Sequence, residues 1–169
     1  MKNRFLILFV LAATLFSCNS DSMISDDLNK KAVERPFKIK NLEGVFQLGG
    51  GDPAECGPTV LSASGQGTPT HLGNSMFSEQ WCWTGQLDDL GTRTSVITAA
   101  NGDELWCTIE TIDWPVPDQS FIETVKFEGG TGRFSNVSGQ FTQYVEIQFD
   151  CNGCPTGTFI MNAEGTIKY

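Results

Sequence analysis

Val96-Ile97-Thr98-Ala99-Ala100-Asn101-Gly102-Asp103-Glu104-Leu105-Trp106-Cys107 consists of two runs of strand-forming residues joined by Asn101-Gly102. Asn-Gly accepts a positive φ at both central positions of a type I′ turn, and such a turn closes a tight β-hairpin. A two-residue turn at this point places Val96 opposite Cys107 and Arg93 opposite Glu110. We therefore expect a hairpin here, with an Arg93–Glu110 ion pair that contributes little to stability because it lies on the surface.

Similar runs, separated by turn residues, continue on both sides of this hairpin. The predicted strands span residues 37–48, 59–64, 71–84, 92–100, 103–112, 121–128, 137–150 and 156–169. Pro115 and Pro117 are expected to end the fifth strand, because proline cannot donate a hydrogen bond to the ladder. Short strands without a convincing helix or a long-period repeat predict an all-β fold. We expect an eight-stranded antiparallel β-barrel, closed so that no strand edge is exposed.

The charge of the chain excludes some classes of partner. The chain has 20 acidic and 11 basic residues, which gives a formal net charge of −9. Nucleic acid and anionic lipid head groups would repel such a protein, so we expect neither as a partner. A simpler explanation stays open, namely that the charge only keeps an exported protein soluble.

The N-terminus has the features of an export signal. A basic start, Met1-Lys2-Asn3-Arg4, precedes an apolar run at 5–16 that is too short to span a bilayer. Residues 1–17 are therefore predicted to be a signal peptide. The end of this segment, Leu15-Phe16-Ser17-Cys18, resembles the lipobox of bacterial lipoproteins, in which cleavage before the cysteine frees it for lipid attachment. The alternative is an ordinary cleaved leader with an unmodified Cys18.

The lipobox resemblance implies an anchor and a location. A lipid on Cys18 would hold the protein at a membrane without spanning it. Asn19 is not the aspartate associated with inner-membrane retention, so we expect an outer membrane lipoprotein. Residues 18–35 are polar and are predicted to form the lipidated cysteine and a disordered tether. Ser25-Asp26-Asp27 resembles the acidic signals that send some lipoproteins to the cell surface, although solvated linkers are often acidic as well.

Turn motifs in residues 36–169, the predicted barrel domain, resemble those of a known family. The motifs are Thr70-His71-Leu72-Gly73, 98–103, 129–134, 137–139 and 164–169. They are similar to the pattern of bacterial proteins with an allene-oxide-cyclase-like, dirigent-type barrel, which is calycin-like. Many members form trimers, so the resemblance implies a homo-oligomer. Plant members cyclise an unsaturated epoxide or guide phenoxy-radical coupling inside the barrel, and their catalytic positions have no residue-by-residue match in this chain.

Two predicted strands place carboxylates among aromatic side chains. Alternation puts Phe77, Glu79, Trp81 and Trp83 on one face of the third strand, and Glu123 lies on an aromatic face of the sixth. If these faces point into the barrel, they form a pocket with polar anchors for a small apolar ligand. Burial there would raise the pKa of the carboxyls toward general-acid chemistry. The alternatives are glutamates at a water-filled rim and an aromatic face on the outside of the barrel.

The 6 cysteines indicate an oxidising compartment. A turn at Asn152-Gly153 makes Cys151 and Cys154 cross-strand partners within disulfide reach, roughly 5.5 Å between Cα atoms. We predict a structural disulfide, with a redox or zinc CxxC as the alternatives. If Cys18 is lipidated, one further cysteine stays unpaired unless it links to another chain. The candidates are Cys56, Cys82 and Cys107.

His71 is the only histidine, which excludes a Ser-His-Asp triad and a histidine-rich metal site. We expect neither a metal nor a cofactor. The sequence therefore favours a membrane-anchored, extracytoplasmic barrel that acts as a non-enzymatic binding or interaction module. A more specific version of this hypothesis is that the barrel binds a small apolar ligand in its lumen. The alternative is a cofactor-independent cyclase or isomerase that acts inside the barrel.

Overall fold

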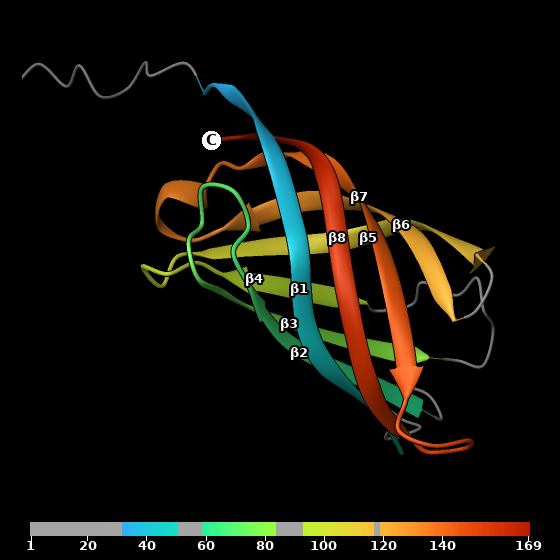
Figure 1. Cartoon of the computed structure of the whole chain (residues 1–169). Coiled ribbons are helices and arrows are strands. Elements are labelled where there is room, and N and C mark those ends of the chain that lie inside the picture. The colour runs from blue at the N-terminus through green and yellow to red at the C-terminus, as the bar shows by residue number, and fades with distance from the viewer. Residues whose placement is uncertain (1–31, 51–58, 84–92, 117–118) are drawn as a thin grey trace, which may run out of the picture. The chain divides into compact units, whose positions relative to one another are not determined.

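The computed structural model describes residues 32–50, 59–83, 93–116 and 119–169. These residues form antiparallel strands that close into a barrel, so the predicted all-β fold is confirmed (Figure 1). Each strand pairs with the next along the chain, and the first completes the ring by pairing with the last. The elements are β1 Glu34–Gly50, β2 Thr59–Gly67, β3 Ser75–Trp83, β4 Thr94–Thr98, β5 Glu104–Val116, β6 Ser120–Gly130, the 3₁₀ turn η2 Gly132–Phe134, β7 Ser138–Phe149 and β8 Thr156–Lys168.

The connections between strands alternate between the two ends of the barrel, because each strand runs opposite to its neighbours. We name the end with the β2–β3, β4–β5 and β6–β7 connections the closed end. The start of β1 and the end of β8 also lie there (Figure 1). The opposite end, where β1, β3, β5 and β7 end, is the mouth end.

Aromatic rings fill the barrel toward the closed end. Phe37, Phe127 and Phe141 contact one another with ring centroids 5.0–5.2 Å apart. Leu72 of the β2–β3 connection and Phe134 of η2 belong to the same buried cluster. Inward and outward positions alternate along each strand, so a period-two apolar pattern supplies this interior. The closed end is therefore a packed hydrophobic core.

The β4–β5 hairpin differs from its predicted form by one residue. Val96 pairs with Trp106, so the predicted pairing with Cys107 is wrong. Gly102 has a φ of +86° whereas Asn101 has no positive φ, as in a three-residue hairpin turn that ends in a left-handed residue. A shift of one residue moves side chains to the opposite face of a strand. Arg93 therefore points into the barrel, and the expected surface pair with Glu110 is wrong.

The strand limits differ most from the predicted ones at the start of β3 and at the end of β5. β3 begins at Ser75 rather than at 71, because His71 adopts a positive φ of 70° within a turn. β5 continues to Val116, so Pro115 does not end it. Its pairing with β6 is irregular between Asp113 and Val116, and such an irregularity is where a strand tolerates proline.

Candidate ligand-binding site

A cavity of about 190 Å³ lies inside the barrel toward the mouth end. Most of its wall consists of aromatic and aliphatic side chains that occupy the inward positions of the strands. The aromatic members are Phe46, Phe77, Trp81, Phe121, Phe149 and Phe159. An apolar cavity of about 150 Å³ holds a benzene molecule, so this space suits a small apolar group.

Three polar residues, Glu79, Arg93 and Gln143, also line the cavity. Arg93 donates from Nε to Oε1 of Glu79 at 2.7 Å, and its Nη1 contacts Oε1 of Glu123. Gln143 donates from Nε2 to Oε2 of Glu123. The guanidinium also lies over the indole ring of Trp81, 4.9 Å from its centroid. We name Glu79, Arg93, Glu123 and Gln143 together the Arg93 cluster.

The Arg93 cluster carries an excess of negative charge when both of its carboxyls are ionised. Glu79 is 5 % exposed, Arg93 6 % and Glu123 0 %, so water does little to screen these charges. Burial raises the pKa of Glu123 to about 7, with the carboxylate of Glu79 adding to the rise and Arg93 and Gln143 opposing it. Burial lowers the pKa of Arg93, but the two carboxylates more than offset this and raise it overall. Glu123 is thus a group that takes up a proton near neutral pH.

The structure places the predicted site residues as follows. Phe77, Glu79 and Trp81 line the cavity. Glu123 does not line it, but the residue is buried directly behind Arg93 and Gln143. The side chain of Trp83 lies outside the described part of the structure. The two glutamates therefore lie inside the barrel. The alternatives, a position at a water-filled rim and an aromatic face on the outside of the barrel, are wrong for both residues. Their role in ligand binding stays a prediction.

Sequence reasoning missed two members of the cluster. A two-residue turn predicts Arg93 on the surface, whereas the three-residue turn of the structure directs it into the barrel. Gln143 occupies an inward position of β7 between the buried Phe141 and Val145. A single polar residue within an otherwise apolar period-two pattern was the signal that could have revealed it.

The cysteines have structural roles where they are described. Cys151 and Cys154 are at disulfide distance in the β7–β8 connection, with Cα atoms 5.1 Å apart, in agreement with the predicted bridge. Cys82 is also disulfide-bonded. Cys107 is a free, buried thiol, and burial raises its pKa to about 12, so it is not a nucleophile at neutral pH. Cys18 and Cys56 lie outside the described residues.

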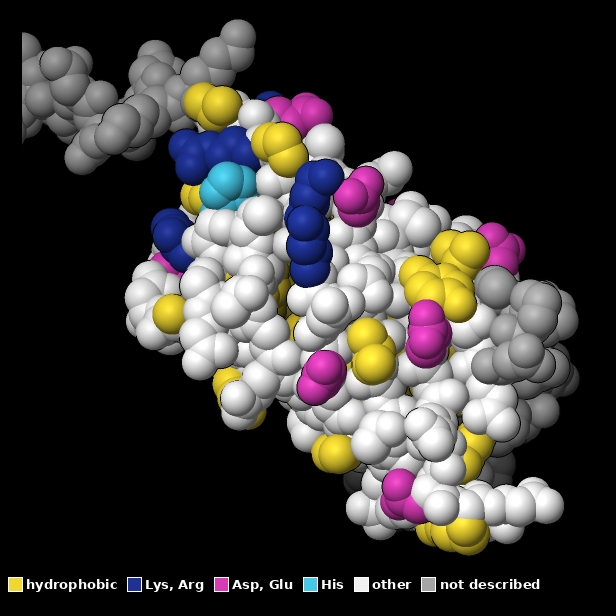
Figure 2. Space-filling model, in the orientation of Figure 1, with side chains coloured by type: hydrophobic (Ala, Val, Ile, Leu, Met, Phe, Trp, Pro, Cys, Tyr) yellow, Lys and Arg dark blue, Asp and Glu magenta, His cyan; other side chains and the backbone are white. Residues whose placement is uncertain are grey.

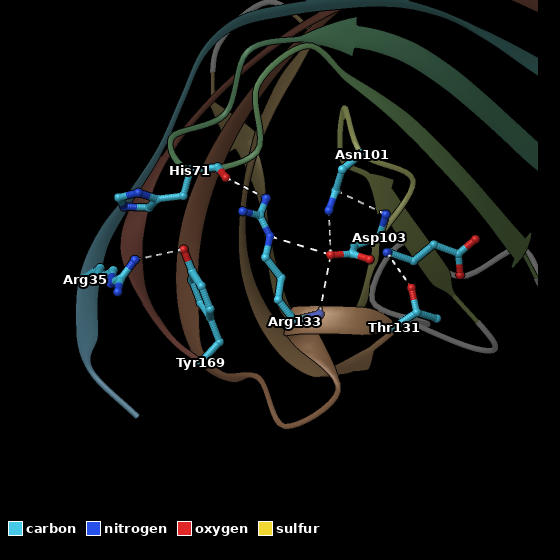
Figure 3. A network of polar contacts seen from close by, with 8 residues as sticks. Arg35, His71, Asn101, Asp103, Thr131, Arg133 and Tyr169 are labelled. Carbon is cyan, nitrogen blue, oxygen red and sulfur yellow. Dashed lines mark hydrogen bonds and ion pairs between the residues drawn. The ribbon is translucent and has the colours of Figure 1, made fainter. Parts of the chain in front are cut away.

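A second polar network joins the connections of the closed end (Figure 3). Asp103 accepts a hydrogen bond from Nδ2 of Asn101 at 2.8 Å and pairs with Nε of Arg133 at 3.7 Å. Arg133 also donates from Nη2 to the carbonyl oxygen of His71 at 2.8 Å. The ring Nε2 of His71 lies 3.0 Å from the carbonyl oxygen of Pro36. The turn motifs quoted above thus hold three connections together, which is a structural role for the histidine.

In comparisons with known proteins, no family model, no curated protein and no solved structure matches the chain. Across 32–50, 59–83, 93–116 and 119–169, no three or more His, Cys, Asp or Glu side chains are grouped to hold a metal ion. The same residues contain no helix that is long and apolar enough to cross a membrane. The cavity and the Arg93 cluster are the features of the described residues that point to a function.

Proposed function

We propose that the barrel binds a small, mainly apolar ligand in the mouth-end cavity. The observation that carries this proposal is an apolar cavity of about 190 Å³ bordered by a buried cluster of charged side chains. Both features lower the stability of a protein: a void loses packing contacts, and buried charges lose hydration. Ligand pockets commonly combine an apolar wall with a few polar anchors. A binding role accounts for both features at once.

The protein's place in the cell is a second part of the proposal. We propose that residues 1–17 are a signal peptide and that Cys18 is lipidated, so that the barrel is tethered to the outer membrane or the cell surface. The finer fold assignment, an allene-oxide-cyclase-like and dirigent-like barrel that forms a homo-oligomer, belongs to this proposal as well. The turn motifs at 98–103 and 129–134 support it.

Replacing Cys18 tests the anchor. Cys18→Ala should release the protein from the membrane fraction and remove the mass of a diacylglycerol group from the purified chain, as measured by fractionation and intact mass spectrometry. Ser17→Ala keeps the cysteine and is the matched control. An unmodified mass for the wild-type chain, or unchanged membrane association in Cys18→Ala, would contradict the lipid anchor.

One observation favours a catalytic alternative. Glu123 has a pKa of about 7 and lies next to two residues that line the cavity, so a proton is available in the interior near neutral pH. A cofactor-independent cyclase or isomerase would need such a group. Turnover of an unsaturated epoxide, followed by chromatography of the products, distinguishes this alternative from simple binding, and Glu123→Gln should abolish it.

Native mass spectrometry after incubation with a lipid and metabolite extract of the host tests the binding proposal. We expect the wild-type protein to retain a small mass. Ala63→Phe should abolish retention, because Ala63 lines the cavity and a larger side chain fills it. Ser64→Phe is the matched control, because Ser64 is the exposed neighbour on the same strand. Absence of any retained mass, or equal retention by both variants, would contradict binding in the cavity.

A further inference from the structure

We infer that the ligand is a cation with an apolar body, such as a small arylalkylammonium compound, and that its positive charge lies against Glu79 at the inner end of the cavity. This inference rests on the proposed binding function and specifies the chemical class of the ligand. Three features support it: the unbalanced charge of the Arg93 cluster, an oxygen of Glu79 that receives no hydrogen bond from a described residue, and the distribution of charge between the two ends of the barrel.

When both of its carboxyls are ionised, the Arg93 cluster has a net negative charge that one further cation would neutralise. Glu79 and Glu123 share a single guanidinium, and both residues are buried. An uncompensated buried carboxylate is costly, so the cluster is stabilised either by a proton or by a second positive charge. The cavity lies directly beside the cluster, since Glu79 and Arg93 form part of its wall. A ligand cation in this space would balance the charge.

Glu79 provides the contact atom. Both contacts with Arg93, from Nε and Nη2, go to Oε1. Among the described residues, no hydrogen-bond donor contacts Oε2 of Glu79. The side chain is only 3 % exposed, and a buried carboxylate oxygen normally has a donor. An ammonium group in the cavity would be such a donor, with a charge-assisted hydrogen bond.

The aromatic wall suits the same class of ligand. Phe77, Trp81 and Phe159 line the cavity, and ring faces attract a cation at about 6 Å or less from the centroid. Arg93 already makes this kind of contact with Trp81. An apolar body that carries an ammonium group therefore finds favourable partners for both of its parts.

Charge is distributed unevenly along the barrel axis. The β7–β8 connection at the mouth end, residues 150–155, contains Asp150 and no Lys, Arg or His, and Arg93 is the only described Lys or Arg residue toward this end. The exposed basic residues of the described barrel lie toward the closed end and are Arg35, Lys38, Lys40, Lys126, Arg133 and Lys168. In Figure 2 the Lys and Arg side chains gather at the end where β1 begins. The resulting field attracts cations to the mouth and repels carboxylates such as fatty acids.

A matched set of probes tests the inference on the wild-type protein. 2-Phenylethylammonium, 2-phenylethanol and phenylacetate share a phenyl body and differ in charge. Titration calorimetry should give a Kd for the ammonium that is at least about tenfold lower than for the alcohol, equivalent to about 1.4 kcal/mol, with phenylacetate the weakest. Higher salt should reduce the preference, because it screens the field of the mouth end.

Variants of the cluster locate the source of the preference. Glu79→Gln removes the excess charge and leaves Arg93 paired with Glu123, so it should fold and lose the preference for the ammonium over the alcohol. Glu146→Gln is the matched control, because Glu146 is an exposed carboxylate on β7 that does not line the cavity. It should keep the preference. Near-ultraviolet circular dichroism confirms that each variant is folded.

The outcomes separate this inference from the binding proposal. Equal affinity for the ammonium and the alcohol, or tighter binding of phenylacetate, overturns the cation inference and leaves binding in the cavity intact. If none of the three probes binds, the cation inference also fails. The extract experiment then shows independently whether the cavity holds any ligand.

Discussion

At the closed end of the barrel, Phe37, Phe127 and Phe141 pack ring against ring, whereas at the mouth end six aromatic side chains surround a space of about 190 Å³. Polar groups show the same contrast. The closed-end network around Arg133 is exposed and links connections, while the Arg93 cluster is buried and borders the cavity. The strands are continuous through both ends. The difference shows that the packed interior and the cavity are divided along the barrel axis and not between strands.

Removing the central cation of each network should give the largest difference between the ends. Arg93→Met leaves two buried carboxylates without a counter-charge, so we expect a loss of about 3–5 kcal/mol in the free energy of unfolding above pH 7. Arg133→Met removes an exposed arginine and should cost about 1 kcal/mol or less. Urea unfolding followed by circular dichroism measures both. Similar losses for the two variants would contradict the contrast.

Truncation of one phenylalanine at each end should give the next largest difference. Phe141→Ala opens a void among packed rings and should cost about 3–5 kcal/mol. Phe149→Ala enlarges a space that already exists, beside Phe46, and should cost about 1–2 kcal/mol. Chemical denaturation gives both values. A larger loss for Phe149→Ala would show that the mouth end is packed as tightly as the closed end.

The stability of the protein should depend on pH through Glu123. Between the ordinary pKa of 4.5 and the raised value of about 7, the folded protein holds a proton at Glu123 that the unfolded chain has lost. The free energy of unfolding therefore decreases as the pH rises through this window, by about 1–3 kcal/mol. Subtracting the pH profile of Glu123→Gln isolates this contribution. A difference profile that is flat, or that rises with pH, would contradict the raised pKa.

The smallest effect should come from the turn at the closed end. Gly102 has a φ of +86°, and a Cβ at this position would have no heavy atom within 4 Å. Gly102→Ala should therefore cost about 1 kcal/mol through backbone strain alone. Gly102→Asn should cost less, since asparagine tolerates this conformation better. Thermal unfolding of the two variants compares them, and equal losses would point to a cause other than φ.

The sequence predicted much of the fold because strand alternation and turn residues are local properties. The inward faces of Phe77, Glu79 and Trp81 follow from period two alone. The register of the β4–β5 hairpin does not, because Asn101-Gly102 is compatible with turns of two and of three residues. The two-residue turn places Arg93 on the surface, and without Arg93 the two glutamates have no visible counter-charge. The cavity depends on how the strands close in three dimensions, which no local pattern specifies.

The pairing of Glu34 with Lys168 places the first and last strands of the barrel side by side. Arg35 even donates a hydrogen bond to the hydroxyl of Tyr169 at 3.2 Å. The barrel is therefore a ring of strands in which the break in the chain occupies an arbitrary position. A short linker between residues 169 and 34 should permit circular permutants that begin in the mouth-end connections. A solid support or fluorescent protein attached at residue 169 would lie at the closed end, opposite the end that holds the cavity.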